Sequence, residues 1–517
     1  MRKLIAALAG SIAAAAASPA GAVSIPQGDV EGVVSGAVES FKGIPFVAPP
    51  VGDLRWRPPR PAANWTGVKI AKDFGPVCLQ AARGFFVQQG RMSEDCLTLN
   101  IWRPAAAKPG QRLPVMVWIY GGAFIIGGSS TPFYDGSRFA GRGVILVSFN
   151  YRLGRFGFFA HPALDGGPGP VANYGLMDQI AALKWVKANI AAFGGDPDNV
   201  TVFGESAGAI SVNYLMGSPA ARGLFAKAIA ESGFGRSEPR ALKGEPRAAE
   251  ALGVAFAEAH GINGDDAAAA AALRALPADL LNAPFSGLSD PGLAGPILDG
   301  QVVTQGVAEA FAKGEEARVP YLEGGNSYEA SLFPKIADAP DPVIARLGAP
   351  AKVLAAYGDP APPEAAREIL TDSMITEPDR FLARQMARQG LPAYVYRFSY
   401  VPAASRPTSF GAAHGAEIAY VFDNLSDAPL RFGSFQVPAA TPPDHRVADA
   451  MHAYWVAFAK TGDPNGDQLP AWPKFDPSSR AYIQFTDVGP IAKEGLRRPY
   501  CVIFIENVRR LMPRQEK

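Results

Sequence analysis

The sequence has few cysteines and histidines and almost no excess of charge. Its 517 residues include three cysteines and five histidines, and 49 basic residues against 48 acidic residues leave a formal charge of +1. A chain whose net charge is close to zero does not attract nucleic acid or an anionic membrane through its overall charge. We therefore expect small, near-neutral molecules as partners and no nucleic acid.

Long hydrophobic runs are also scarce, and the clearest one lies at the start of the chain. Arg2 and Lys3 precede an apolar run over residues 4–17, and small residues follow up to Ala22. This run is shorter than the roughly 20 residues that span a bilayer. A basic start and a small-residue end are typical of a signal peptide. We predict a signal peptide over residues 1–22, export to the periplasm or the medium, and no stable membrane anchor; an anchor is the alternative.

Export would place the three cysteines in an oxidising compartment, where a disulfide persists. Cys78 and Cys96 are close in the sequence, whereas Cys501 is far from both. We predict a disulfide between Cys78 and Cys96, which would stabilise the fold by about 3 kcal/mol in the chain-entropy model. Cys501 is then a buried free thiol. Three unbonded thiols are the alternative.

The middle of the chain alternates hydrophobic strands with a helical pattern. Residues 115–120, 144–149 and 200–203 are runs of β-branched and other hydrophobic residues, and hydrophobic residues recur at helical spacing over 176–190. This alternation is typical of βαβ units with a parallel sheet. We predict an α/β fold with a large, mostly parallel sheet flanked by helices. No long polar linker divides residues 23–517, so we expect one domain.

The region from about residue 235 to residue 294 is dominated by Ala, Glu, Arg and Leu. This composition predicts peripheral helices that cover the sheet as a cap. The alanine run over residues 267–272 is low in complexity. Because alanine is the strongest helix former, we predict a helix there rather than disorder.

A serine lies in a short glycine motif directly after the third hydrophobic strand. Residues 204–208 read Gly-Glu-Ser-Ala-Gly, the G-x-S-x-G form, and an apolar helical stretch over residues 207–215 leaves the motif. In a strand-turn-helix setting this motif presents the serine as a nucleophile. An ordinary Gly-Ser turn is the alternative, but the setting favours Ser206 as a nucleophile.

A second glycine turn follows the strand over residues 115–120. It contains Gly121, Gly122 and Ala123. An acyl-transfer serine needs N–H donors directed at the oxygen that becomes negative. The backbone amides of Gly122, Ala123 and Ala207 are the candidate oxyanion hole, and a plain turn after a strand is the alternative.

Two longer stretches resemble the signatures of type-B carboxylesterases, a family that includes bacterial esterases, animal carboxylesterases and cholinesterases. They are residues 193–208 (FGGDPDNVTVFGESAG) and residues 94–104 (EDCLTLNIWRP). The resemblance covers essentially the whole mature chain. It implies the α/β-hydrolase fold with helical cap insertions, and the hydrolysis of small carboxylic esters without a metal or a cofactor.

The family's triad runs in the order serine, acid, histidine. Its acid lies in a glycine-led turn that residues 324–329 resemble, which implies Glu329. Without the resemblance, Asp299, Glu323 and Asp338 are equally good acids. The residues themselves leave this choice open.

The resemblance also indicates the histidine. His414 lies in a small-residue loop over residues 411–417 that is similar to the family's catalytic-histidine segment. The other histidines are expected to be structural or solvated: His161, His260, His445 and His452.

These residues imply a mechanism and leave two alternatives. A serine hydroxyl attacks only when a base removes its proton, so His414 is the expected base, with Glu329 orienting it and Ser206 becoming acylated. Thioesters, carbamates and amides are alternative substrates. A non-catalytic binding or adhesion relative is the alternative from another class, but it has no need of all three triad residues.

A choline-binding esterase is not expected from the sequence. Such members hold a quaternary ammonium on aromatic faces. No tryptophan lies between Leu79 and Asp95, where Phe85 and Phe86 are the large aromatic residues, and the matching position after the acid is Leu332.

Overall fold

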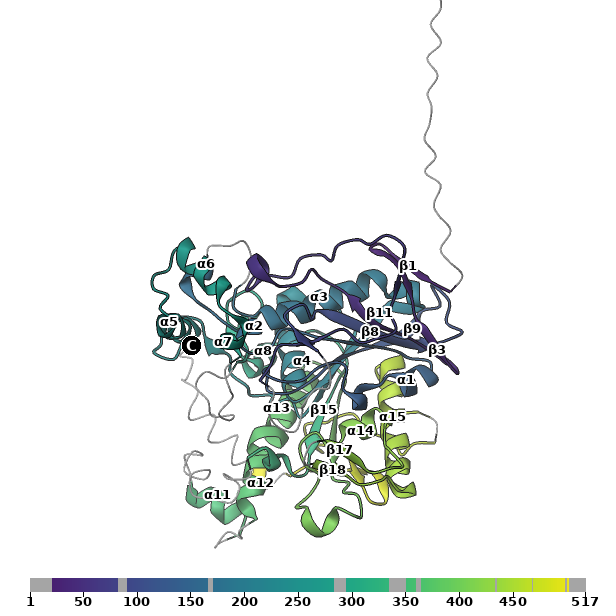
Figure 1. Ribbon diagram of the computed structural model, residues 1–517. Coiled ribbons are helices and arrows are strands. Elements are labelled where there is room, and N and C mark those ends of the chain that lie inside the picture. Colours follow the sequence, from purple (N-terminus) through teal and green to yellow (C-terminus); the bar gives the residue numbers. More distant parts are fainter. Residues whose placement is uncertain are drawn as a thin grey trace, which may run out of the picture.

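The computed structural model describes residues 21–81, 91–165, 171–282, 294–333, 350–358, 364–432, 435–466, 468–497 and 500–501. Its central feature is an 11-stranded sheet with helices packed around it (Figure 1). The parallel strands of this sheet are β10 (Ile145–Phe149), β9 (Leu113–Ile119), β11 (Gly195–Glu205), β12 (Lys227–Glu231), β15 (Tyr321–Asn326), β16 (Ala393–Phe398) and β19 (Tyr482–Thr486). Antiparallel strands extend both edges: β8 (Thr98–Pro104), β4 (Val38–Pro45) and β3 (Val33–Ser35) beside β10, and β20 (Gly489–Lys493) beside β19.

Smaller sheets and the helices complete the described part. The short strands are β1 (Val23–Ile25), β2 (Gly28–Glu31), β5 (Val68–Ile70), β6 (Val77–Cys78), β7 (Met92–Ser93), β13 (Arg240–Ala241), β14 (Ile297–Leu298), β17 (Leu430–Phe432) and β18 (Phe435–Val437). The helices are α1 (Ser137–Gly141), α2 (Gly154–Gly157), α3 (Tyr174–Asn189), α4 (Ala207–Gly217), α5 (Ala249–Ala259), α6 (Ala267–Ala275), α7 (Ala278–Leu281), α8 (Val307–Lys313), α11 (Pro350–Ala356), α12 (Ala365–Thr371), α13 (Glu377–Arg388), α14 (Ile418–Val421) and α15 (Pro442–Thr461).

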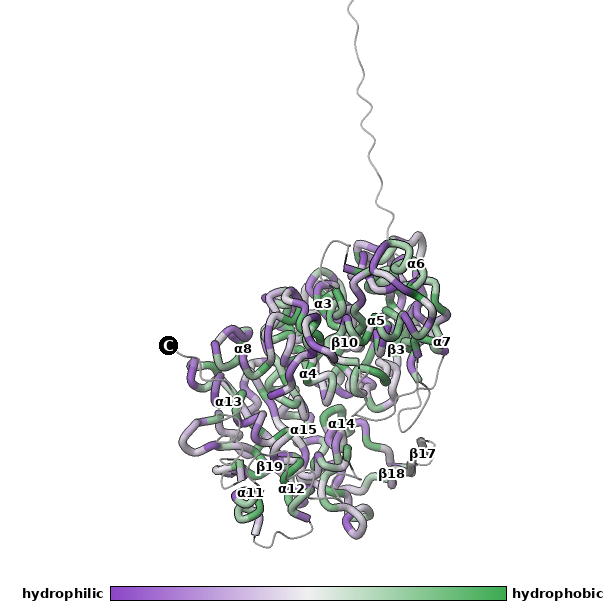
Figure 2. Tube along the Cα trace, turned by 90° about the vertical axis from the view of Figure 1, so that its left-hand side faces the viewer, coloured by the Kyte–Doolittle hydropathy of each residue, from purple (hydrophilic) through white to green (hydrophobic). Residues whose placement is uncertain are grey.

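The predicted α/β architecture is confirmed. β9, β10 and β11 occupy the three predicted strand segments and lie side by side in parallel, and α3 occupies the predicted helix. All residues of β10 are buried, as are the last five of β9. A parallel strand covered by helices on both faces has no solvated side, which is why these runs are continuously hydrophobic. Hydrophobic residues follow the trace through the interior around β10 (Figure 2).

The predicted peripheral helices are also present. Figure 1 shows α5, α6 and α7 grouped at one end of the molecule, beside α2. The alanine run forms α6, and Asp266 caps that helix by accepting a hydrogen bond from the Ala269 N–H at 2.9 Å. Residues 283–293 of the predicted cap lie outside the described residues.

The cysteine prediction is confirmed as well. Cys78 and Cys96 form a disulfide with their Cα atoms 5.0 Å apart, and Cys501 is a buried free thiol. The alternative of three unbonded thiols is wrong. Residues 1–20 of the predicted signal peptide lie outside the described residues. None of the helices in the described ranges has the length and hydrophobicity to cross a membrane.

The order of the strands determines where the predicted site residues meet. In the ladders, Glu205 pairs with Glu231, and Glu231 pairs with Gly324. The carboxyl ends of β11, β12 and β15 therefore lie at the same edge of the sheet, where sites of open α/β sheets form. Ser206 directly follows β11, and the turn of Glu329 follows β15.

Candidate active site

Ser206 lies at the junction between β11 and α4, as the glycine motif predicts. Its backbone has φ 56° and ψ −122°, a strained conformation for a residue with a side chain. Two glycines permit the junction. A Cβ at Gly204 would lie 2.5 Å from the carbonyl oxygen of Ile119, and a Cβ at Gly208 would lie 1.9 Å from it. The turn therefore fixes the serine against the end of β9.

The turn after β9 packs directly against this serine. A Cβ at Gly121 would lie 2.7 Å from the Glu205 carbonyl oxygen and 3.0 Å from Ser206 Cβ, so a glycine is required for the close approach. The next two residues, Gly122 and Ala123, have φ of 110° and 54°. The predicted oxyanion turn and the predicted nucleophile are thus neighbours in space.

The amides of the predicted oxyanion hole are open to a ligand. Across the described ranges, the N–H groups of Gly122, Ala123 and Ala207 donate no hydrogen bond to the protein. Ala207 is the first residue of α4, where N–H groups lack a partner within the helix. Such donors can bind an oxyanion.

Glu329 is fully buried at the start of a 3₁₀ turn, Glu329–Leu332, that follows β15. Its Oε1 accepts hydrogen bonds from the Ser232 hydroxyl and the Asn326 backbone N–H, each at 2.6 Å. Its Oε2 lies 2.5 Å from Nδ1 of His414. The structure therefore brings the predicted acid and the predicted base into direct contact, with the carboxylate held in one orientation.

The second imidazole nitrogen faces a different carboxylate. His414 Nε2 lies 3.0 Å from Glu205 Oε1, although the two atoms are not aligned for a hydrogen bond. Within the described residues, no hydrogen bond joins His414 Nε2 to Ser206 Oγ. The Nε2 atom of His414 therefore faces Glu205, the residue before Ser206. Hydrogen bonds between a base and its nucleophile often tighten only when substrate binds.

The two loops that carry the acid and the base are joined along their backbones. Tyr328 and Ala413 form a parallel bridge, one residue before Glu329 and one before His414. The His414 N–H also donates to the Ser331 hydroxyl at 2.9 Å. A shift of one loop therefore moves the other, which keeps the carboxylate and the imidazole in register.

Further glutamates lie buried around this pair. Glu205, Glu231 and Glu417 are each at most 5% exposed. Burial raises the pKa of all three carboxyl groups above the ordinary value. Glu417 accepts a hydrogen bond from the Asn326 side-chain amide, which also donates to the Ala413 carbonyl oxygen at 2.8 Å.

The charge of His414 depends on these carboxylates. Burial lowers the pKa of the imidazole, but the carboxylates of Glu205 and Glu329 together raise it to about 10. Glu205 and His414 compete for one proton, because burial raises the pKa of Glu205 as well. A protonated Glu205 no longer stabilises an imidazolium. Protonation of Glu205 therefore favours a neutral His414, whereas an ionised Glu205 adds to the effect of Glu329 and favours the cation.

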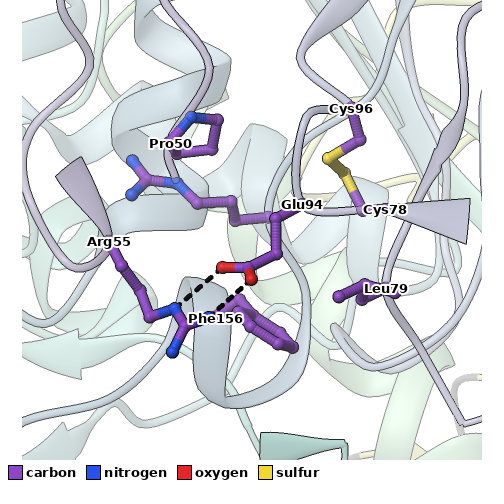
Figure 3. A pocket seen from close by; sticks show the side chains of 8 residues that line it. Pro50, Arg55, Cys78, Leu79, Glu94, Cys96 and Phe156 are labelled. Carbon is purple, nitrogen blue, oxygen red and sulfur yellow. Dashed lines mark hydrogen bonds and ion pairs between the residues drawn. A yellow bond between two sulfur atoms is a disulfide. The ribbon is translucent and has the colours of Figure 1, made fainter. Parts of the chain in front are cut away.

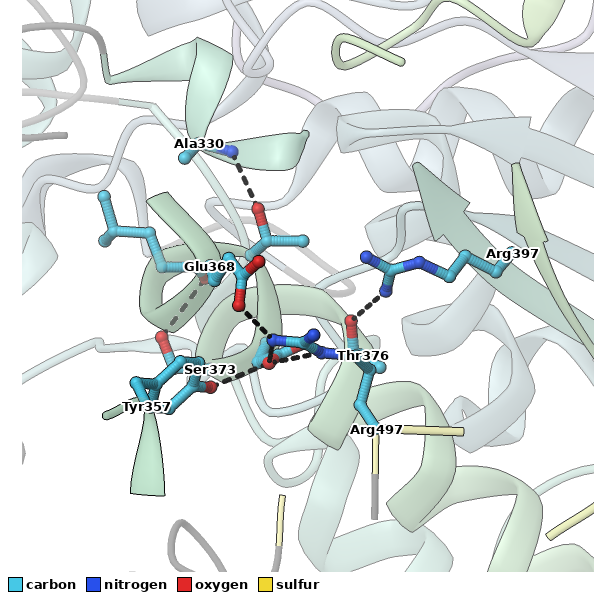
Figure 4. Close-up of polar contacts among 10 residues, drawn as sticks. Ala330, Tyr357, Glu368, Ser373, Thr376, Arg397 and Arg497 are labelled. Carbon is cyan, nitrogen blue, oxygen red and sulfur yellow. Dashed lines mark hydrogen bonds and ion pairs between the residues drawn. The ribbon is translucent and has the colours of Figure 1, made fainter. Parts of the chain in front are cut away.

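The turn of Glu329 is supported from behind by α12 (Figure 4). The N–H of Ala330, the residue after Glu329, donates to the Thr371 hydroxyl at 3.3 Å. Thr371 is the last residue of α12, and a π-helical turn, Asp372–Thr376, follows it. The position of the acid thus depends on the end of this helix.

Asp372 anchors that helix end. It is buried and accepts hydrogen bonds from the Tyr357 hydroxyl and from Arg497 Nη2, each at 2.7 Å. Arg497 also binds Glu368 at 2.9 Å (Figure 4). A residue near the end of the chain therefore stabilises the segment behind Glu329.

The other candidate acids lie elsewhere. Asp299 accepts hydrogen bonds from the backbone N–H groups of Gln301, Val302 and Val303 in its own turn. Glu323 is buried within β15, and Asp338 lies outside the described residues. The four other histidines have partners away from Ser206: His161 with Ala163, His260 with Phe256, His445 with Asp427 and His452 with Val421.

A narrow hollow beside the disulfide is lined in part by the ion pair of Arg55 and Glu94 (Figure 3). Arg55 donates to both oxygens of Glu94, from Nε at 2.8 Å and from Nη2 at 2.5 Å. The hollow shares no residue with the Ser206 site. Phe85 and Phe86 lie outside the described residues, and Leu332 is half-buried at the end of the turn of Glu329.

Comparison with known proteins identifies this arrangement. The model of the carboxylesterase family matches residues 19–346 and 360–503. The chain belongs to the carboxylesterase family. It is 40% identical over 497 residues to the fumonisin B1 esterase of Sphingopyxis macrogoltabida, covering 91% of this chain and 87% of that protein. It is 35% identical over 477 residues to the para-nitrobenzyl esterase of Bacillus subtilis, covering 89% of this chain and 93% of that protein.

Solved structures agree with this assignment. A carboxylesterase of Geobacillus stearothermophilus matches this carboxylesterase with a TM-score of 0.80 at 34% identity, covering 94% of this chain and 100% of that one. The fold is the α/β-hydrolase fold, and the protein is a carboxylic ester hydrolase that acts on small-molecule esters. The predicted family, fold and enzyme class are confirmed.

Sequence reasoning did not single out Glu205, Glu417 or Ser232. Three signals could have found them. Glu205 lies between the first glycine and the serine of the motif, and Glu417 follows His414 by three residues, just before α14. Ser232 directly follows β12, the parallel neighbour of β11, so its side chain reaches the same edge of the sheet.

Proposed function

We propose that this esterase cleaves carboxylic esters through an acyl-enzyme on Ser206, with His414 as the base and Glu329 as the orienting acid. The observation that carries the proposal is the 2.5 Å contact between Glu329 Oε2 and His414 Nδ1, at the sheet edge where Ser206 is held in a strained turn. A buried carboxylate on Nδ1 fixes the tautomer in which Nε2 accepts a proton.

Acylation begins with the attack of Ser206 Oγ on the ester carbonyl carbon. The Oγ–H bond breaks as the new C–O bond forms, and His414 Nε2 takes the proton. The carbonyl oxygen becomes negative and accepts hydrogen bonds from the amides of Gly122, Ala123 and Ala207. His414 then returns its proton to the alcohol oxygen as the ester C–O bond breaks.

Deacylation repeats these steps with water. His414 removes a proton from water, whose oxygen attacks the acyl carbon in the same oxyanion hole. The proton returns to Ser206 Oγ when the acid leaves. His414 must be neutral at the start of each half, so the esterase needs Glu205 in the protonated state or a pH that deprotonates the imidazole.

The test is hydrolysis of p-nitrophenyl esters from acetate to decanoate by the mature protein. We expect turnover with an optimum in acyl length, and a fall in kcat of at least about 10³-fold for Ser206→Ala. Ser35→Ala, at an exposed position of β3, is the matched control and should keep full activity. Equal activity in Ser206→Ala and Ser35→Ala would overturn the assignment of the nucleophile.

We also propose that residues 1–22 are a signal peptide removed on export, and that residues 23–517 form one domain. The basic and apolar start of the chain supports export, as does the Cys78–Cys96 disulfide, a bond that persists in oxidising compartments. N-terminal sequencing of the exported protein should find a start at Gly21 or Val23. Recovery of the enzyme from the cytoplasm alone, with Met1 still present, would contradict export.

A further inference from the structure

A second narrow pocket, formed by residues from the C-terminal part of the chain, is lined by three arginines. Arg380 and Arg384 come from α13, where a spacing of four places them on one helix face. Arg480 comes from the segment before β19. Glu377, Phe475 and Pro477 complete the lining. No triad or oxyanion residue belongs to this pocket.

Arg380 is a buried cation that forms no ion pair with any of the described residues. The residue is 5% exposed, and its Nε and Nη1 atoms have no hydrogen-bond partner in the part of the chain that the structure describes. Its polar neighbour is the Cys501 thiol, whose pKa burial raises to about 12, so that group is neutral. A buried guanidinium normally pairs with a carboxylate or another anion. The pocket provides no such partner for Arg380 among the described residues.

Arg384 adds a second, partly buried cation. Its Nε is buried and has no hydrogen-bond partner among the described residues. Burial lowers the pKa of its guanidinium; Glu377 opposes this effect, and the positive charges of Arg388 and Arg380 add to it. The positive charges of the two arginines therefore repel each other.

The one carboxylate among the described lining residues, Glu377, is already paired with a different arginine. Glu377 accepts two hydrogen bonds from Arg236, from Nε at 2.6 Å and from Nη2 at 2.7 Å. The Phe381 ring packs on the guanidinium of Arg236 with its centroid 3.9 Å away, which holds that pair in place. Glu377 is thus the hydrogen-bonded partner of Arg236, and among the described residues it forms no ion pair with Arg380 or Arg384.

We propose that this pocket is a second binding site, which takes a small oxyanion as the counterion of Arg380 and Arg384. Guanidinium groups match the oxygen atoms of phosphate, sulfate and carboxylate groups through parallel N–H donors. The occupant is either an inorganic oxyanion or a small carboxylate, and it binds apart from the ester. The site lies outside the proposed catalytic residues and does not depend on their assignment.

The experiment measures thermal unfolding and isothermal titration of the mature esterase with sodium phosphate, sodium sulfate or sodium acetate. Ionic strength is held constant with sodium chloride. We expect a saturable rise in Tm with the oxyanion that fits, beyond the effect of chloride. Phosphate or sulfate acting alone identifies an inorganic anion site, and acetate acting alone identifies a carboxylate site. No saturable change with any of the three overturns the proposal.

Three variants decide whether the effect arises in the pocket. Arg384→Gln should weaken the binding at least about tenfold, because it removes charged hydrogen-bond donors. Arg380→Met should abolish the response and leave Tm in chloride unchanged or higher, because it removes an unpaired buried charge. Arg112→Gln, at a side chain that is 61% exposed, is the matched control and should respond as the parent does.

The proposal can still be tested if one of these variants fails to fold. Hydrolysis of p-nitrophenyl acetate reports folding of each variant, and Arg384→Gln alone is sufficient when Arg380→Met is unfolded. An anion response in folded Arg384→Gln equal to that of the parent would place the anion elsewhere and overturn the site.

Discussion

Glu205 Oε1 lies 3.0 Å from His414 Nε2, the imidazole nitrogen that the proposed mechanism requires as proton acceptor. The carboxylate of Glu329 occupies the other nitrogen. An ionised Glu205 would hold the imidazole as a cation and prevent it from acting as a base. The buried setting that raises the pKa of Glu205 therefore supports catalysis near neutral pH, because it favours the neutral carboxyl group.

The first prediction concerns this contact. Glu205→Gln removes a charge that raises the pKa of His414, so the acidic limb of the kcat/KM profile should move to lower pH by about one unit or more. The measurement is the pH profile of p-nitrophenyl acetate hydrolysis. Glu309→Gln, on the exposed face of α8, is the control and should keep the parental profile. A shift to higher pH would show that Glu205 does not act through the charge of His414.

The second prediction concerns stability. Burial raises the pKa of Glu417, so the folded protein keeps a proton that the unfolded chain releases above about pH 4.5. Raising the pH from about 5 to about 8 should therefore lower the free energy of unfolding. Glu417→Gln should reduce this decline, by about 1.4 kcal/mol for each unit of pKa difference removed.

Urea unfolding at several pH values measures the decline. Glu309→Gln again serves as the control, because its carboxyl group is exposed. Parallel stability curves for Glu417→Gln and the parent would show that Glu417 titrates as it does in the unfolded chain.

The third prediction concerns the segment behind Glu329. Arg497→Leu leaves Asp372 buried without its charged partner, which should lower the free energy of unfolding by about 3 kcal/mol or more. The equivalent change at Lys313, in an exposed pair with Glu309, should have little effect. Urea unfolding compares the two. Equal stability of both variants would show that the Asp372 pair does not support the fold.

The fourth prediction concerns the oxyanion turn. Ala123 has φ 54°, a backbone conformation that is strained for a residue with a Cβ. Ala123→Gly should relieve the strain and widen the space for the alcohol. We expect the rate on a tertiary-alcohol acetate, relative to a primary one, to rise about tenfold. An unchanged ratio would show that Ala123 does not limit the alcohol.

The sequence predicts those features that local patterns determine. The continuous hydrophobic runs of β9, β10 and β11 arise because both faces of these strands are covered, so their positions follow from the residues alone. The strained turn of Ser206 requires Gly204 and Gly208, and both are the glycines of the G-x-S-x-G motif. The alanine run forms a helix for reasons of propensity alone.

Features that depend on distant contacts could not be derived in this way. Glu329 was no better than Asp299 as an acid without the family resemblance, because its role depends on a turn 85 residues from His414. The contact between Glu205 and His414 and the burial of Arg380 likewise follow from the packing of separate strands and helices. Neither the amino-acid composition nor the net charge of +1 indicates these contacts.

The most direct test of the central claim is covalent labelling with a fluorophosphonate ester, followed by mass spectrometry of the digested protein. We predict one phosphonyl group per chain, attached to the peptide that contains Ser206, with ester hydrolysis lost in proportion to the labelling. Ser206→Ala should take up no label, and His414→Ala should react far more slowly because the base is missing. A label on another residue, or full labelling of Ser206 without loss of hydrolysis, would contradict the assignment of the nucleophile.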